Sequence, residues 1–562
     1  MKAYNQHSFY LPSGDEHLAC TALVPTCVKG AVIMLLPFSE ERKGTLPLLL
    51  ELARDLNSNS IASLIFDWRG TGDSSGELTS VDPEDFTSDF STALAWLQNT
   101  LPQIPITAVG VRLSAALLPE LAQKHPEIDR VVMLSPCSGS EFTRQLLQRR
   151  MVNDMVAYGK ARESRAALLK QLQSGNSVDL DGYTFTANMY SWVNTIRLEA
   201  PASENSDSIP RLSQALIIPG GHSRKTIEAA TSIISSAKIS DLRFPPFWNT
   251  VGHIDLSDLI RTTADWINRG FTTSSIRTAQ PRTNPATTRT ELISITNLDS
   301  TIRAVIKKPD REPKGGILFL PGWSGDRTGP HRMFTQLASK LVDAGYLTLR
   351  PDFRGRGLSD GKHAKASIAS MAEDAATALA SLKLRVPEGS PLYVVAICSG
   401  CKVAITLTAD HPQIAKLLLF SAESMGHLRS SKTDSNKTQK ALYIYLKKMT
   451  QLDTWKKILT GRVQTRMVTK ALIKHESRSE YEAKSEDEIL KRFGAYRNPM
   501  RFVFGGSDPD APGSMRSYKS YCNKHSIPHS LHLIPHAGHS YYSSEWTADA
   551  FETSINFLVK NL

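Results

Sequence analysis

The stretch that sets the fold is Asp352-Phe353-Arg354-Gly355-Arg356-Gly357-Leu358-Ser359, because the chain of 562 residues carries it twice. The earlier copy reads Asp67-Trp68-Arg69-Gly70-Thr71-Gly72-Asp73-Ser74 and lies 285 positions upstream. Each copy follows a short apolar run, residues 61–66 and 345–350, that is typical of a buried strand. A repeat with this long a period predicts two domains of one kind.

Further landmarks recur in the same order in both halves. Apolar runs end at Pro37 and Pro321, 30 and 31 positions before the two aspartates. The distance from Arg112 to His253 is 141 positions, and so is the distance from Cys398 to His539. Short apolar strands alternate with helical patterns, which indicates a mostly parallel sheet flanked by helices in each half. We therefore predict an α/β fold in tandem.

The domain boundaries follow from composition. Residues 272–290 are rich in Thr, Ser, Pro and Arg and are predicted to be a linker. This places the first domain at 1–271 and the second at 291–562. Within the second, about 80 residues separate two predicted strands, and we expect a helical cap at about 422–498.

The composition is that of an ordinary globular protein, with 41% hydrophobic and 22% charged residues. No apolar run reaches the length of a membrane span, and no secretory signal is visible. Six cysteines in 562 residues do not form a disulfide framework, so we expect a cytoplasmic protein. Neither a cofactor nor a metal site is expected.

The net charge of +11 is concentrated in one segment. Residues 429–474 contain twelve basic and two acidic side chains, a net of +10, with aromatic and aliphatic residues interleaved at helical spacing. This pattern fits a solvated face of the cap, attraction of an anionic or carrier-bound acyl substrate, or peripheral contact with an anionic membrane. A nucleic-acid partner is not expected, because no nucleic-acid-binding motif appears.

The sequence Ala396-Ile397-Cys398-Ser399-Gly400 is typical of a sharp turn from a strand into a helix that exposes a nucleophile. A thiol at Cys398 suits this role, since a helix N-terminus and a neighbouring imidazole favour the thiolate. Two alternatives stay open at this point. Cys398 could be a buried small hydrophobic residue, or it could form a redox pair or a regulatory disulfide with Cys401.

The partners of the nucleophile follow downstream. Asp508 comes at the end of an apolar strand, with Asp510 as an alternative, and can orient an imidazolium. His539 is the predicted base, and His536 and His532 are alternatives. Two main-chain N–H groups, of Ser399 and Trp323, are expected to form an oxyanion hole, where Gly322 permits close backbone approach.

The first half lacks these groups. Its corresponding turn, Gly110-Val111-Arg112-Leu113-Ser114, carries an arginine, which cannot act as a nucleophile because it stays protonated. Ser223 stands at the position of Asp508. A shifted nucleophile at Ser114 is a less favoured alternative, so the first half is predicted to be non-catalytic. Arg112 could hold a carboxylate or phosphate, or this half could be a purely structural docking partner.

These residues resemble the α/β-hydrolase superfamily over nearly the whole chain. The first half, with residues 36–43 and 110–113, resembles exosortase A system-associated hydrolases of type 2. The second half, with residues 329–334 and 443–446 and the Cys398 turn, resembles type 1. It departs from type 1 at Ser399, where an acidic residue is expected, and at position 396, where glycine is expected. The resemblance implies a setting of bacterial exopolysaccharide and protein sorting.

The sequence thus predicts two tandem α/β-hydrolase domains that dock on each other, the second catalytic. We expect an acyl hydrolase (esterase or thioesterase) or acyltransferase with the triad Cys398, His539 and Asp508. Gly322, Arg112 and His331, which lies in the segment 329–334, are the expected binding residues. The alternative is a non-catalytic binding or scaffold protein made of two such domains.

Overall fold

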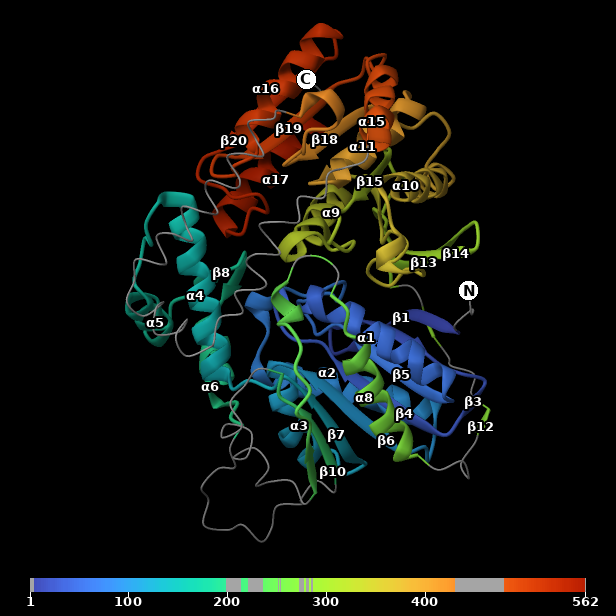
Figure 1. Ribbon diagram of the computed structural model, residues 1–562, viewed down its shortest axis with the longest axis vertical. Coiled ribbons are helices and arrows are strands. Elements are labelled where there is room, and N and C mark those ends of the chain that lie inside the picture. Colours follow the sequence, from blue (N-terminus) through green and yellow to red (C-terminus); the bar gives the residue numbers. More distant parts are fainter. Residues whose placement is uncertain are drawn as a thin grey trace.

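Two eight-stranded sheets, one in each half of the chain, organise the fold (Figure 1). The computed structural model describes residues 5–198, 214–220, 236–250, 252, 254–271, 277–278, 283–284, 287–429 and 480–560. The first sheet has the spatial order β1 (Gln6–Ser13), β2 (Glu16–Leu23), β5 (Ile61–Phe66), β4 (Gly30–Leu35), β6 (Ile106–Val111), β7 (Ile128–Leu134), β10 (Gln214–Ile218) and β11 (Ala237–Ile239).

The second sheet repeats this order strand for strand. It runs β13 (Thr290–Asn297), β14 (Ser300–Lys307), β16 (Leu347–Pro351), β15 (Gly316–Leu320), β17 (Leu392–Ile397), β18 (Lys416–Phe420), β19 (Met500–Gly505) and β20 (His529–Ile534). In both sheets the first two strand pairs are antiparallel and the others are parallel. The identical topology confirms the predicted tandem α/β-hydrolase fold.

Helices cover both faces of each sheet. In the first half they are α1 (Glu41–Ser58), α2 (Pro83–Thr100), α3 (Leu113–Lys124) and α8 (Ser257–Arg269). In the second half they are α9 (Met333–Asp343), α10 (Ile368–Lys383), α11 (Gly400–Asp410), α15 (Glu480–Phe493), α16 (Ala511–Lys524) and α17 (Ser544–Leu558). Among the helices described, none is long and apolar enough to cross a lipid bilayer.

The central strands are apolar along their whole length because both faces of the sheet are buried. In β15, Leu318 and Leu320 join one core cluster, whereas Ile317 and Phe319 join the cluster on the opposite face. This alternation follows from the two-residue period of a strand. It explains why the sequence shows these strands as continuous apolar runs.

An insertion between β7 and β10 extends the first half toward the second. It consists of α4 (Gly139–Tyr158), α5 (Arg165–Gln173), β8 (Val178–Leu180), β9 (Tyr183–Phe185) and α6 (Ala187–Thr195). In Figure 1 this teal segment lies beside β20 and α17 of the second half. The Ser507 hydroxyl donates a hydrogen bond to the carbonyl of Ala157, and the Tyr158 ring packs against His536.

The predicted cap and linker lie mostly outside the described residues. Residues 430–479 of the predicted cap are not described. The part that follows them, helix α15, lies against the domain and does not cover the site. Helix α15 packs on α11 with Leu490 and Phe493 in the core, so it flanks the sheet. In the linker, β12 (Arg277–Thr278) pairs with β3 (Cys27–Val28) of the first half.

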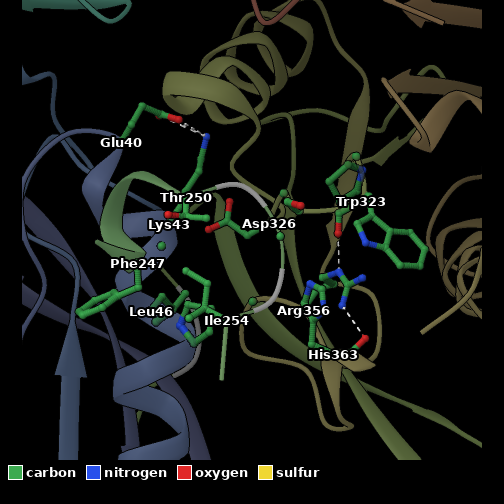
Figure 2. Close-up of a pocket in the computed structure, with 18 of the residues that line it drawn as sticks. Glu40, Lys43, Leu46, Phe247, Thr250, Ile254, Trp323, Asp326, Arg356 and His363 are labelled. Carbon is green, nitrogen blue, oxygen red and sulfur yellow. Dashed lines mark hydrogen bonds and ion pairs between the residues drawn. The ribbon is translucent and has the colours of Figure 1, made fainter. Parts of the chain in front are cut away.

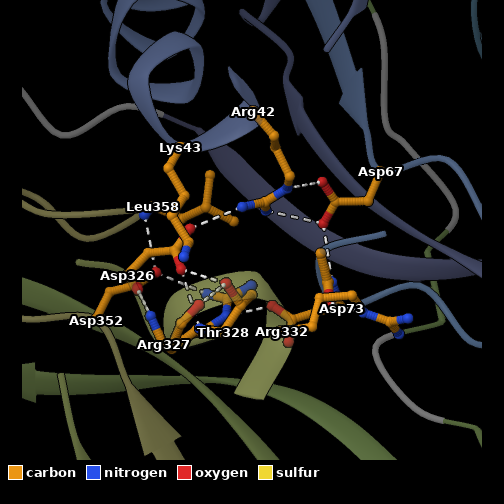
Figure 3. Close-up of polar contacts among 12 residues, drawn as sticks. Arg42, Lys43, Asp67, Asp73, Asp326, Arg327, Thr328, Arg332, Asp352 and Leu358 are labelled. Atoms are coloured by element: carbon orange, nitrogen blue, oxygen red, sulfur yellow. Dashed lines mark hydrogen bonds and ion pairs between the residues drawn. The ribbon is translucent and has the colours of Figure 1, made fainter. Parts of the chain in front are cut away.

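Buried ion pairs join the two halves (Figure 3). Arg42 contacts its own Asp67 at 2.5 Å and Asp326 of the other half at 2.7 Å. In the mirror arrangement, Arg327 contacts Asp352 at 3.0 Å and reaches Asp73 of the first half at 2.7 Å. The two arginines therefore have equivalent roles, and each links the two halves.

Candidate active site

Cys398 sits on a strained turn between β17 and α11. Its φ is 58°, in the left-handed region that non-glycine residues rarely adopt, and its N–H donates a hydrogen bond to the Phe420 carbonyl. A Cβ atom on Gly400 would lie 2.4 Å from the Leu320 carbonyl oxygen, so only glycine permits this close approach of helix and strand. The local sequence therefore forms the turn that its small residues predict.

His539 and Asp508 meet beside Cys398. The His539 Nδ1 atom and the Asp508 Oδ2 atom are 2.8 Å apart, and the carboxylate is nearly inaccessible. Ser421 steadies the histidine loop by donating a hydrogen bond to the His539 carbonyl at 2.8 Å. Burial lowers the pKa of His539, but hydrogen bonds to Asp508 and Cys398 outweigh it and raise this pKa to about 11.

The alternative acid and bases have other partners. His532 contacts Asp549 at 2.7 Å, and His536 packs against Tyr158 of the insertion. The Asp510 N–H donates a hydrogen bond to Asp508. The geometry thus brings only Asp508 and His539, among these candidates, to the nucleophile turn.

The redox alternative finds no support in the environment of Cys401. Both Cys398 and Cys401 are free thiols. Cys401 is fully buried, its Sγ donates to the Phe420 carbonyl, and burial raises the pKa of its thiol well above the usual range. A buried, protonated thiol is poorly suited to disulfide exchange.

The expected oxyanion donors lie next to the nucleophile. A Cβ atom on Gly322 would be 3.1 Å from the Cys398 Cβ, so the backbone passes directly over the thiol. The Trp323 N–H donates to the Ser399 hydroxyl at 2.6 Å. The Ser399 N–H begins α11, where first-turn donors have no partner within the helix. The two predicted donors are therefore neighbours, and the Trp323 N–H is engaged by the Ser399 hydroxyl.

Comparison with known families agrees with this geometry. Residues 46–175 and 312–543 match the family described as serine aminopeptidase S33, which is a family of α/β hydrolases. The chain belongs to the S33 family. The matched residues include the second-half turn that carries Cys398. No curated protein matches the sequence of the chain. The narrower resemblance of each half to exosortase-associated hydrolases stays a prediction.

Solved structures with a similar fold each align with about half of this S33 chain. A serine hydrolase homologue from Coxiella burnetii is 16% identical, with a TM-score of 0.33, and the alignment covers 49% of this chain and 99% of that one. Est1E from Butyrivibrio proteoclasticus, solved with ferulic acid, is 16% identical, with a TM-score of 0.34 and coverages of 48% and 100%. A thermostable carboxyl esterase from Bacillus coagulans is 15% identical, with a TM-score of 0.33 and coverages of 48% and 98%.

Two charged residues of this S33 site are absent from the sequence prediction. The Cys398 Sγ donates to Glu423 Oε1 at 3.4 Å, and Lys402 forms an ion pair with the same carboxylate at 2.7 Å. Burial raises the pKa of Glu423, but the charge of Lys402 and its hydrogen bond outweigh it and lower this pKa. The sequence did contain a signal for Glu423. This residue follows β18, which is the neighbour of β17, and parallel strands end at the same edge of a sheet, so Glu423 and Cys398 are expected to lie close together.

The corresponding position in the first half corrects one prediction. Arg112 has a φ of 59°, so the turn has the same backbone shape as the Cys398 turn, but the Arg112 side chain is fully buried. It forms an ion pair with Glu41 at 3.2 Å and stacks over the Trp248 ring at 4.4 Å. The guanidinium of Arg112 is thus already paired with the carboxylate of Glu41, and an external anion is not expected to reach it. Ser114 is also buried, and its hydroxyl donates to the Leu36 carbonyl. His253 and Ser223 lie outside the described residues.

His331 lies between the two halves of the chain instead of facing a ligand. The residue is 1% exposed, the ring Nε2 contacts the Ser540 carbonyl, and the main-chain N–H donates to the carboxylate of Glu40 in the first half. A Cβ on Gly182 of the insertion would lie 2.6 Å from the ring. Burial lowers the pKa of His331 to about 4, so the ring is neutral. We therefore correct its predicted binding role to a packing role between the halves.

The nucleophile opens into a cavity of about 2090 Å³ whose walls come from both halves (Figure 2). The second half contributes Cys398, His539 and the segment 321–326. The first half contributes α1, α4 and the residues around Trp248. Within the described ranges, no cluster of three or more His, Cys, Asp or Glu side chains is placed to hold a metal ion.

Proposed function

We propose that the second half is an acyl hydrolase that uses Cys398 as its nucleophile on an ester or thioester. The observation that carries this proposal is the 2.8 Å contact between His539 and Asp508 beside a cysteine on a strained turn. An imidazole held by a buried carboxylate next to a nucleophile is the arrangement that acyl transfer requires.

In the proposed reaction, His539 takes the proton of the Cys398 thiol before the attack, as the raised pKa of His539 favours, and the sulfur then attacks the acyl carbonyl. Asp508 holds the imidazole in one orientation and stabilises its protonated form. The N–H groups of Ser399 and Trp323 stabilise the negative charge that develops on the carbonyl oxygen. His539 then protonates the leaving group. Water, activated by His539, releases the acyl group, or an acceptor hydroxyl takes it in an acyltransferase.

The size of the cavity supports a substrate larger than a simple ester. Pockets for small ligands typically enclose about 300–1,000 Å³. The cavity here has about 2090 Å³ and is lined by both halves. We infer an acyl group attached to an extended carrier, with the first half serving as a wall of the binding site.

Replacing the nucleophile tests the proposal. We expect Cys398→Ala to abolish hydrolysis of short p-nitrophenyl esters and acyl thioesters, because the proposed acyl-enzyme forms on the Cys398 sulfur. Cys27→Ala is the matched control, since Cys27 is an exposed cysteine of the first half. Retained turnover in Cys398→Ala would refute the assignment.

A scaffold protein without activity is the alternative, favoured by the buried and paired state of Arg112 in the first half. Competitive labelling with a thiol-directed acyl probe separates the two. If the protein is an enzyme, the probe should label Cys398 selectively at neutral pH. If it is a scaffold, the probe should label Cys398 no faster than the exposed Cys27.

A further inference from the structure

Arg356, in the repeated stretch of the second half, is a buried cation surrounded by neutral groups. Its side chain is 4% exposed. Nε donates to the Trp323 carbonyl at 2.5 Å, and Nη1 donates to the carbonyls of Gly355 and His363 at 3.1 and 3.4 Å. The guanidinium lies 4.8 Å from the centroid of the Trp323 ring (Figure 2).

No carboxylate among the described residues is paired with this guanidinium, and its Nη2 atom is buried without a hydrogen-bond partner. Burial lowers the pKa of Arg356 to about 10, so the group is still charged at neutral pH. Four other buried or half-buried cations of the same cavity have acidic partners: Lys43 with Glu40, Arg54 with Asp360, Arg149 with Asp181, and Lys402 with Glu423. An unpaired buried charge is costly unless a ligand compensates it.

The turn itself does not require an arginine. The first half builds the same turn with Thr71 at the corresponding position. Gly70 and Gly355 have φ values of 69° and 71°, and the N–H groups of Thr71 and Arg356 make equivalent 2.9 Å hydrogen bonds. Since a neutral residue suffices for this backbone, the charge of Arg356 needs another explanation.

Arg356 lies close to the reacting groups. It lines the same cavity as Cys398 and His539. The Trp323 residue connects it to the nucleophile turn, because its carbonyl accepts from Arg356 and its N–H donates to Ser399. An anion bound by this guanidinium would therefore share the cavity with the nucleophile turn.

We propose that Arg356 binds an anionic group, a carboxylate or a phosphate, of the ester or thioester substrate. This inference rests on the proposed function and narrows its substrate class. Guanidinium groups suit this role because their N–H donors match carboxylate and phosphate oxygens. Arg356 is thus a binding residue that selects charged substrates.

Matched substrate pairs test the proposal and distinguish the two anions. One pair is a p-nitrophenyl ester of a dicarboxylic acid and the neutral ester of equal chain length. The other pair is an acyl-pantetheine with and without its terminal phosphate. We expect wild-type kcat/KM to be about tenfold or more higher for the charged member of one pair, as a charge-assisted hydrogen bond implies.

The variants are Arg356→Gln, Arg356→Lys and, as control, Lys362→Gln. Lys362 is an exposed cation lining the same cavity. Arg356→Gln should lose the preference, because kcat/KM should fall more for the charged substrate than for the neutral one, and Arg356→Lys should keep part of the preference. Lys362→Gln should retain it in full. Melting temperatures verify that each variant is folded.

Several outcomes would overturn the proposal. One is equal wild-type rates for charged and neutral substrates. A second is an equal loss for both substrates in Arg356→Gln, which would mean that Arg356 only supports the Trp323 loop. If the wild type hydrolyses nothing, the proposed function fails instead. Calorimetric titration with glutarate and with inorganic phosphate then decides whether the anion site exists, since binding should vanish in Arg356→Gln.

Discussion

The main-chain N–H of Trp323 donates a hydrogen bond to the hydroxyl oxygen of Ser399 across 2.6 Å. Both residues are predicted to stabilise the oxyanion, so one donor of the pair is already engaged before a substrate arrives. A substrate carbonyl must therefore displace the Ser399 hydroxyl to reach this donor. The nucleophile turn in this chain thus contains an internal competitor for its own oxyanion hole.

Removing this competitor should increase activity. Ser399→Ala leaves the Trp323 N–H available to the substrate and preserves the Ser399 main chain. We expect kcat/KM for a neutral ester to rise by about fivefold, because a neutral hydrogen bond is worth about 1 kcal/mol. Steady-state kinetics measures the effect, and a clear decrease would show that the hydroxyl assists the reaction.

The His539–Asp508 pair should make stability depend on pH. Its folded pKa of about 11 lies above the ordinary value of 6.5, so its stabilisation is full below pH 6.5 and is lost as the pH rises toward 11. Asp508→Asn should reduce this alkaline loss, because the hydrogen bond with Asp508 is the largest of the interactions that raise the pKa of His539, and it should lower kcat by about 100-fold or more. Unfolding by denaturant at pH 6, 8 and 10 measures the first effect.

The control for Asp508→Asn is Asp549→Asn. Asp549 contacts His532 at 2.7 Å in a comparable His–Asp pair away from the nucleophile. This variant should leave turnover unchanged. A similar loss of turnover in both variants would contradict the specific role of Asp508.

The carboxylate of Glu423 should restrain the reactivity of Cys398. A negative charge about 4 Å from a developing thiolate opposes it by ~4 kcal/mol at an effective dielectric constant of 20. We expect Glu423→Gln to accelerate alkylation of Cys398 by iodoacetamide at pH 7 by about tenfold or more. Asp410→Asn, at the exposed far end of α11, is the control. An unchanged alkylation rate would exclude this electrostatic coupling.

The ion pairs between the halves should dominate their docking. Arg327→Met leaves Asp73 and Asp352 buried without this partner, and breaking a buried pair costs about 3–5 kcal/mol. The exposed pair of Arg261 and Asp258 offers the control Arg261→Met, with an expected loss below about 1 kcal/mol. Denaturant unfolding of both variants measures the difference, and equal losses would contradict the role of Arg327.

The acid dependence of the same network follows from the pKa of Asp73. Burial raises this pKa, but Arg327 and Arg350 outweigh burial and lower it below the usual range. The stabilisation is therefore present above about pH 4, the ordinary value, and is lost as the pH falls below it. Asp73→Asn should flatten the stability curve in acid. An unchanged acid limb would show that Asp73 does not contribute.

The sequence by itself determined the features that depend on local geometry and chain order. Small residues around Cys398 specify a sharp strand-to-helix turn, because larger side chains would collide with the neighbouring strand. The repeated spacing predicted two domains of one kind, each with a mostly parallel sheet. The structure confirms this and shows the same strand order in both halves. The position of Asp508 at the end of an apolar strand also predicted a carboxylate that can orient the imidazole of His539.

Only the tertiary structure decided which side chains meet across long sequence distances. It paired Arg42 with Asp326 and Arg327 with Asp73 and placed Glu423 against Cys398. It gave Arg356 no carboxylate partner among the residues that the structure describes. It also filled the first-half site with the ion pair of Arg112 and Glu41. The physical reason is that hydrophobic periodicity specifies which face of an element is buried, whereas charge pairing depends on how the two folded halves approach each other.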